Sequence, residues 1–158
     1  MKGSGVRVPA SASVTLLRME HIGIVVDDLP AATAFFLALG LRLQGETTVE
    51  GDVVDRINGL DGVRAELVML ETPDANVRLE LVKYHSPPHE ADAAAQPANA
   101  PGIRHILFVV DDIEAAFAGL QPHGAELVGE LVQWEESYKL CYLRGPAGII
   151  VELAEKLG

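Results

Sequence analysis

The chain has few of the residue types that mark secreted, nucleic-acid-binding or membrane proteins. Its 158 residues include a single cysteine, Cys141, which excludes an intramolecular disulfide and favours a reducing compartment. Basic side chains number 12 against 23 acidic ones, and the formal net charge of -11 disfavours nucleic acid and anionic membrane surfaces as partners. No apolar run reaches the roughly 20 residues that cross a bilayer. The sequence therefore predicts a cytoplasmic protein.

The chain does contain enough apolar residues for one packed domain. Hydrophobic residues make up 49% of it and charged residues 22%, which is typical of a globular protein. At this length we expect one unit, or two small halves that share a core, rather than two independent catalytic domains. Residues 1–18, where Pro9 and several serines interrupt any apolar run, are expected to form a disordered tail without a targeting signal.

An internal repeat dominates the sequence. The 26 residues that begin at His21, HIGIVVDDLPAATAFFLALGLRLQGE, match the 26 that begin at His105, HILFVVDDIEAAFAGLQPHGAELVGE, at 13 positions without a gap. Each copy opens with an alternating apolar stretch that suits a buried strand. Aspartate pairs follow as N-cap candidates, then apolar residues at helical spacing, then a glycine that suits a left-handed C-cap. The caps are Asp27, Asp28, Asp111 and Asp112 at the starts, and Gly40 and Gly124 at the ends.

Three more strand-like stretches follow each predicted helix. They cover residues 43–49, 63–70 and 77–84 in the first copy, and residues 126–132, 138–144 and 149–154 in the second. Each half therefore reads β-α-β-β-β, which predicts an α+β fold with one module over residues 19–84 and another over residues 102–158. The Pro- and Ala-rich residues 85–101 are expected to form a surface linker.

Strand alternation puts one histidine and one glutamate of each half on the face that the helix does not cover. His21 and His105 open the first strands, while Glu80 and Glu152 lie between apolar neighbours in the last strands. Singly, such residues are more often structural or simply solvated. Because these four occupy equivalent places in a repeat, we expect them to converge and bind one divalent ion: Zn, Ni, Co, Mn or Fe.

The motifs HIGIVVDD and HILFVVDD, LELVK around Glu80, and RGPAGIIVEL around Glu152 resemble the glyoxalase, bleomycin-resistance and extradiol-dioxygenase superfamily, also called vicinal oxygen chelate proteins. The resemblance runs from about Met19 to the C-terminus. It implies two modules that form an eight-stranded cupped mixed sheet with helices on the outer face, a central metal and a homodimer. Glyoxalase I enzymes are similar in their metal ligands, which would here be His21, Glu80, His105 and Glu152.

This resemblance implies a metal-dependent lyase or isomerase, like glyoxalase I or an epimerase. Such an enzyme would act on a small carbonyl substrate through a metal-stabilised enediolate, with Glu152 first and Glu80 second as the base. The alternative is a non-catalytic drug- or small-molecule-binding protein of the bleomycin-resistance type. Extradiol dioxygenases and fosfomycin-type thiol transferases use two histidines and one glutamate, so Glu80 disfavours both.

Three further residues are candidates for the substrate pocket. Arg78 shares the predicted open face with Glu80 and could hold an anionic group of a small-molecule substrate, although a salt bridge is the simpler role. Tyr138 and Tyr142 alternate along one strand face and could line the pocket, although tyrosines in strands often only pack. Cys141 is expected to be a small buried apolar residue rather than a nucleophile.

Overall fold

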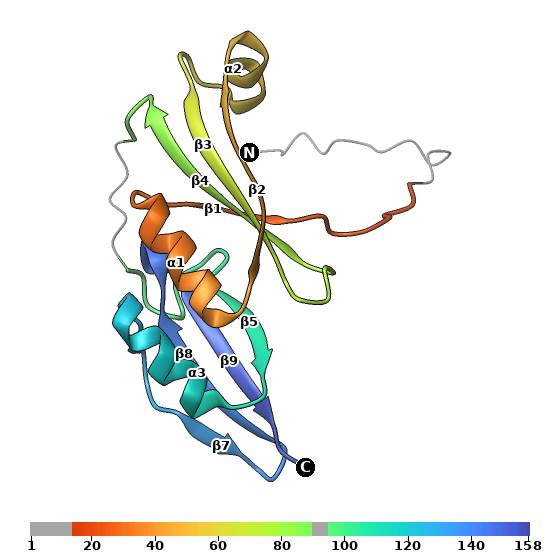
Figure 1. Ribbon diagram of the computed structural model, residues 1–158, viewed down its shortest axis with the longest axis vertical. Coiled ribbons are helices and arrows are strands. Elements are labelled where there is room, and N and C mark those ends of the chain that lie inside the picture. The colour runs from red at the N-terminus through yellow and green to blue at the C-terminus, as the bar shows by residue number, and fades with distance from the viewer. Residues whose placement is uncertain (1–13, 90–94) are drawn as a thin grey trace, which may run out of the picture.

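The computed structural model describes residues 14–89 and 95–158, which form two modules of the predicted β-α-β-β-β order (Figure 1). The first module contains β1 (Ile22–Val25), α1 (Leu29–Leu39), β2 (Arg42–Glu50), α2 (Asp52–Asn58), β3 (Arg64–Glu71) and β4 (Arg78–Ser86). The second contains β5 (His105–Val110), α3 (Ile113–Leu120), η1 (Gln121–His123), β6 (Glu126–Leu127), β7 (Val132–Trp134), β8 (Tyr138–Arg144), η2 (Pro146–Gly148) and β9 (Ile150–Lys156). Within these described ranges no helix is long and apolar enough to cross a membrane.

Parts of two expectations fall outside the described residues. The tail was expected over residues 1–18. Residues 1–13 lie outside the described residues, and residues 14–18 belong to no helix or strand. Of the linker expected over residues 85–101, residues 90–94 lie outside. Strand β4 continues to Ser86, so regular structure extends two residues into that linker.

The strands form two mixed sheets, one in each module. The order is β1-β4-β3-β2 in the first sheet and β5-β9-β8-β6 in the second, with β7 also paired to β8. Strand β1 runs parallel to β4 and β5 runs parallel to β9, while the remaining pairs are antiparallel. The predicted α+β fold with two repeated modules is confirmed. Among the described residues no strand pairing joins the two sheets into the single eight-stranded sheet, so β1 and β5 are both edge strands.

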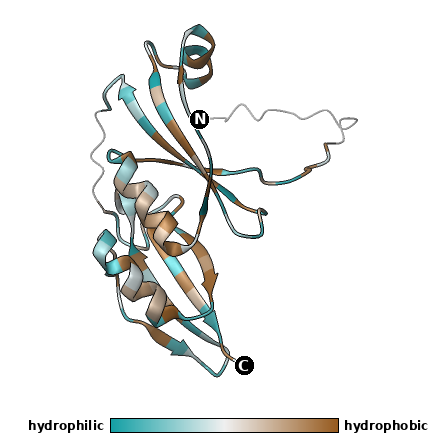
Figure 2. Cartoon of the chain, viewed as in Figure 1, coloured by the Kyte–Doolittle hydropathy of each residue, from teal (hydrophilic) through white to brown (hydrophobic). Residues whose placement is uncertain are grey.

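One hydrophobic core joins the modules, and α1 lies at its centre. Helices α1 and α3 lie side by side, and α1 also contacts β3 and β4 (Figure 1). Phe36 on α1 is fully buried, with its ring centroid 6.4 Å from that of Phe108 on β5. Hydrophobic colouring is dense on β5 and on the neighbouring end of α1 (Figure 2). The first module's helix is therefore part of the second module's core.

Both long helices start at the second aspartate of the predicted cap pairs. The carboxylates of Asp28 and Asp112 accept hydrogen bonds of 3.0 Å from the backbone N–H groups three residues on. Gly40 ends α1 with a φ of 120°, which an L-residue rarely adopts. The second helix ends earlier than expected, at Leu120, because Pro122 has no N–H to continue the ladder. Gly124 ends the short turn η1 instead.

Helix α2 was not predicted from the sequence. It has only seven residues, and its three apolar residues are too few for helical periodicity to reveal it. Its Val54 packs against a small cluster that includes Val82 of β4, which is buried. The strand expected over residues 126–132 is also different, because the chain leaves the sheet near Gly129 and forms β6 and β7 as separate short strands.

Candidate functional site

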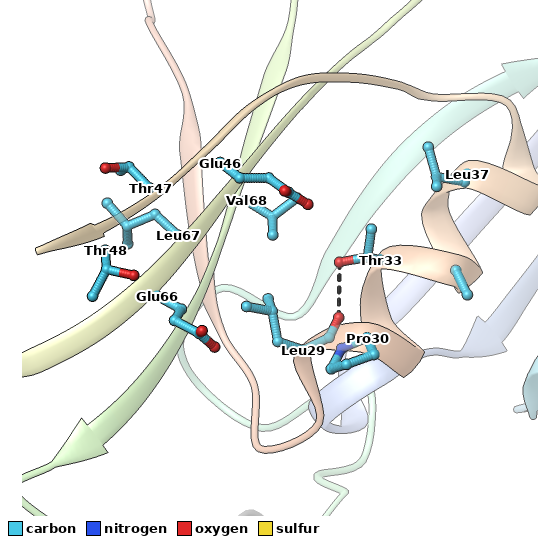
Figure 3. Close-up of a pocket in the computed structure, with 11 residues that line it drawn as sticks. Leu29, Pro30, Thr33, Leu37, Glu46, Thr47, Thr48, Glu66, Leu67 and Val68 are labelled. Atoms are coloured by element: carbon cyan, nitrogen blue, oxygen red, sulfur yellow. Dashed lines mark hydrogen bonds between the residues drawn. The ribbon is translucent and has the colours of Figure 1, made fainter.

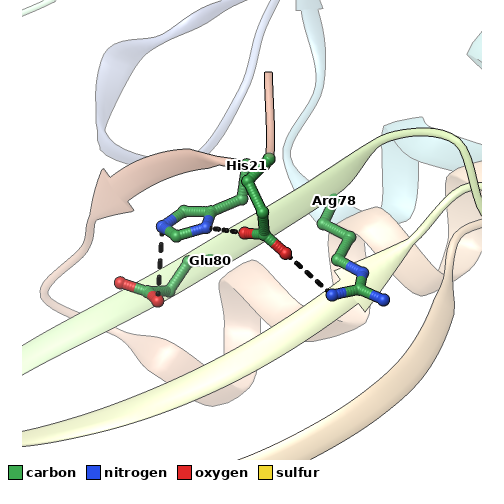
Figure 4. Close-up of polar contacts among 4 residues, drawn as sticks. His21, Arg78 and Glu80 are labelled. Carbon is green, nitrogen blue, oxygen red and sulfur yellow. Dashed lines mark hydrogen bonds and ion pairs between the residues drawn. The ribbon is translucent and has the colours of Figure 1, made fainter. Parts of the chain in front are cut away.

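The first half-site pairs His21 with Glu80 (Figure 4). His21 directly precedes β1, and Glu80 lies in the middle of β4, where its strand partner is Gly23. The Nε2 atom of His21 lies 3.6 Å from Oε2 of Glu80. Leu79 and Leu81, on either side of Glu80, are buried towards α1, whereas the Glu80 side chain is 23% exposed. The pair thus lies on the open face of the first sheet, meaning the face turned away from α1, as the alternation predicted.

Two more charged residues complete the first half-site. Arg78 donates a hydrogen bond of 2.8 Å from Nη1 to Oε1 of Glu20, and the other oxygen of Glu20 contacts Nδ1 of His21 (Figure 4). The hydrogen bond with His21, assisted by Arg78, lowers the pKa of the Glu20 carboxyl. Arg78 therefore takes the simpler of its two expected roles, a salt bridge. Sequence analysis missed Glu20 because the repeat places Arg104, not an acid, at the equivalent position.

The second half-site repeats the pairing with His105 and Glu152. His105 opens β5, and Glu152 lies in the middle of β9 opposite Leu107. Their Nε2 and Oε2 atoms are 3.4 Å apart, and the Glu152 side chain is 16% exposed. The Tyr142 ring lies beside the imidazole of His105, with centroids 5.2 Å apart. Tyr142 therefore belongs to this half-site.

Tyr138 lies outside the second half-site. It starts β8, four residues from Tyr142, which is about 13 Å along a strand. Its strand neighbours are Trp134 and Lys156 rather than either member of the His105 pair. Cys141 is buried as expected, and burial raises the pKa of its thiol, so it does not act as a ready nucleophile.

The structure does not bring the two half-sites together within one chain. Across residues 14–89 and 95–158, no group of three or more His, Cys, Asp or Glu side chains is placed to hold a metal ion. The reason is the packing of the modules: α1 and α3 join them, and each His–Glu pair stays on its own sheet. One chain therefore presents two separate half-sites of matching composition.

The open faces also expose apolar side chains beside the half-sites. Val25 on β1 and Leu107 and Val109 on β5 are 53%, 51% and 69% exposed. By contrast, a groove of about 530 Å³ lies on the opposite face of the first sheet, between α1 and strands β2 and β3 (Figure 3). Its residues include Thr33 and Leu37 on the helix and Glu46 and Glu66 on the sheet, and no half-site residue lines it.

Comparisons with known proteins find the same fold in other chains. A glyoxalase family protein from Bacillus cereus, known from a crystal structure, is 46% identical, with a TM-score of 0.89 over 94% of this chain and 100% of that one. The uncharacterized protein YaeR from Escherichia coli is 28% identical over 142 residues, which is 89% of this chain and 98% of YaeR. TnmS3, an antibiotic binding protein from a Streptomyces species, shares the fold at 18% identity and a TM-score of 0.57, over 91% of this chain and 99% of TnmS3. Residues 18–153 match the sequence model of the Glyoxalase/Bleomycin resistance protein/Dioxygenase superfamily, and the chain belongs to this superfamily.

Proposed function

We propose that the protein is a divalent-metal-dependent lyase or isomerase that acts on a small carbonyl substrate, and that each metal site forms between two copies of the chain. His21 and Glu80 of one copy and His105 and Glu152 of the other would hold the ion. The observation that carries the proposal is the repeated His–Glu pair, which has nearly the same Nε2-to-Oε2 distance in both modules.

The geometry of each pair fits metal binding. Two donor atoms that each lie about 2.0–2.2 Å from one ion are roughly 3.0–3.5 Å apart. The separation of 3.4 Å in the second half-site lies at the upper end of that range, and the separation of 3.6 Å in the first lies just above it. Two imidazole nitrogens and two carboxylate oxygens also suit a borderline divalent ion, so the residues present fit the group that the family commonly binds.

The edge strands support a site shared between two copies. Within residues 14–89 and 95–158, β1 and β5 each pair with one strand, and such edges are available for pairing with another chain. An open groove runs along each edge, about 350 Å³ beside β1 and about 630 Å³ beside β5. A twofold dimer that places β1 of one copy against β5 of the other would bring complementary half-sites together twice. It would also cover Val25, Leu107 and Val109.

The chain's own residues suit proton transfer beside a carbonyl group. A bound divalent ion would polarise the carbonyl oxygen of the substrate as a Lewis acid. Glu152 is the less exposed of the two carboxylates, so water competes less for its oxygens, and we assign it to take the proton from the adjacent carbon and return it. Glu80 is the second candidate for this role. Tyr142 would restrict the imidazole of His105 on one side.

A binding protein without catalysis remains the alternative, and exposed aromatic residues favour it. Trp134 and Tyr138 are exposed on neighbouring strands of the second module, where they could stack against a planar ligand. Such a role needs no proton transfer, so replacing one carboxylate would leave ligand binding intact.

The proposal is tested by metal content, assembly and turnover in one set of proteins. We expect protein purified without chelator to be a dimer by light scattering, with one divalent ion per chain by elemental analysis. Turnover would be assayed on a hemithioacetal and on a methylmalonyl thioester.

Glu152→Gln should lose the ion and the turnover. The control Glu155→Gln makes the same charge change on the same strand but on the face towards α3, and it should keep both. A metal-free monomer, or full turnover in Glu152→Gln, would contradict the proposal.

A further inference from the structure

We propose that Glu20 and Arg78 are positioning residues that hold the His21 imidazole with its proton on Nδ1, which leaves the Nε2 lone pair free beside Glu80. These residues hold His21 in this way in the protein before any ion binds. Its last step, that this arrangement prepares His21 to bind the ion, rests on the function proposed above.

The contact with Glu20 determines which ring nitrogen carries the proton when the imidazole is neutral. An ionised carboxylate can only accept hydrogen bonds, so the contact between Glu20 and Nδ1 of His21 requires a proton on that nitrogen. In a neutral imidazole the other nitrogen, Nε2, is then an acceptor. Nε2 points towards Oε2 of Glu80 at 3.6 Å, which is longer than a hydrogen bond (Figure 4). In this neutral form both atoms are acceptors, and a cation between them could bind to both.

Arg78 has a separate task, which is to hold Glu20. Glu20 precedes β1 in a segment that belongs to no helix or strand, and its side chain is well exposed. Holding such a side chain in one rotamer costs conformational entropy, which the bond of 2.8 Å from Arg78 opposes. Arg78 lies two residues from Glu80 on the open face of β4, so one strand positions both the proposed ligand and the residue that holds Glu20.

The second half-site shows that the fold does not require this arrangement. Arg104 occupies the place equivalent to Glu20, and His105 lies against the Tyr142 ring. In the described part of the chain no hydrogen bond to Nδ1 of His105 is present. The carboxylate contact is therefore specific to His21. Carboxylates that bond the second nitrogen of a metal-binding histidine fix its tautomer and orientation in this way.

Nitrogen NMR of histidine-labelled, metal-free protein tests the tautomer at a pH where the imidazoles are neutral. We expect His21 to carry its proton on Nδ1 in the wild type. Neutral histidine in water prefers the proton on Nε2, so Glu20→Ala and Arg78→Met should move His21 towards that form. Glu114→Gln is the matched control, because it breaks an ion pair of 2.9 Å between α3 and β8, and neither Glu114 nor Lys139 contacts an imidazole. It should leave the His21 signals unchanged.

Calorimetric titration with Zn²⁺ and Ni²⁺ then tests the consequence for ion binding. Glu20→Ala should weaken binding by about 10- to 100-fold. Arg78→Met is the sharper variant, because removing a positive charge near a cation site would tighten binding if only the net charge mattered. If Arg78 acts by holding Glu20, Arg78→Met should instead weaken ion binding several-fold. Arg78→Lys should restore part of the lost affinity.

The outcomes separate this inference from the proposed function. A wild type with the His21 proton on Nε2, or a tighter Arg78→Met, would overturn the positioning role even if the protein binds a metal. A wild type that has the expected tautomer but binds neither ion would overturn the proposed metal site, and with it the ion-binding step of this inference. If Glu20→Ala and Arg78→Met both bind the ions more weakly and show the expected tautomer shift, the result supports the positioning role and the proposed metal site.

Discussion

Replacing Phe36 with alanine should destabilise the whole chain rather than one module. Phe36 is fully buried, 5.2 Å from the Phe35 ring in an edge-on arrangement and 6.4 Å from the Phe108 ring. A buried aromatic side chain removes about 150–250 Å² from water, and at roughly 25 cal/mol per Å² this amounts to about 4–6 kcal/mol. Partial collapse of the cavity reduces the expected loss in the free energy of unfolding to about 3–5 kcal/mol.

Urea unfolding with two probes measures this loss and shows whether the modules unfold together. Trp134 is the chain's single tryptophan and reports on the second module, whereas Phe36 belongs to the first. We expect the fluorescence and far-ultraviolet circular dichroism transitions to coincide and to move together in Phe36→Ala, at fixed protein concentration. The neighbouring control Leu37→Ala removes a side chain that is 43% exposed and should cost less than about 1 kcal/mol. A Trp134 transition that stays in place in Phe36→Ala would refute the shared core.

Two further predictions concern the second helix. Asp112→Ala removes the cap that accepts the N–H of Ala115 and should cost about 1 kcal/mol in urea unfolding, whereas Asp111→Ala, which makes no cap bond, should cost less. The hydrogen bond from Lys139 lowers the pKa of Glu114, so the contribution of Glu114 to stability is present above the ordinary carboxyl pKa and is lost as the pH falls through the lowered value. The stability difference between wild type and Glu114→Gln should therefore be present at neutral pH and vanish in acid, and a difference that grows in acid would contradict the ion pair.

Features that depend on local sequence could be predicted. The repeat gave the module order, because each copy carries the same strand, cap and helix signals within 26 residues. Alternation along β4 and β9 correctly placed Glu80 and Glu152 on the face opposite their buried apolar neighbours, since side chains of a strand alternate between its faces. The cap positions Asp28 and Asp112 followed from the residue types that accept N-terminal N–H groups.

Features that depend on the packing of distant segments could not be predicted. The same apolar faces of α1 and α3 would be buried whether the two His–Glu pairs meet within one chain or between two chains. The apolar pattern therefore does not predict which of these two arrangements forms. Helix α2 is too short for a periodic signal, although its position over Val82 shapes the open face of the first sheet. The role of Glu20 depends on Arg78, 58 residues later, and no pattern in either copy links the two.

Complementation between two inactive variants tests the shared site most directly. One variant carries His21→Ala and Glu80→Gln, and the other carries His105→Ala and Glu152→Gln. If each site takes one half from each copy, a mixed dimer has one intact site and one doubly damaged site. Random exchange at equal concentrations makes about half of the dimers mixed, so about a quarter of the wild-type sites should return. We expect metal binding and turnover to recover to about that level in the mixture and to be absent in each variant alone. No recovery after confirmed subunit exchange would contradict a site shared between two copies.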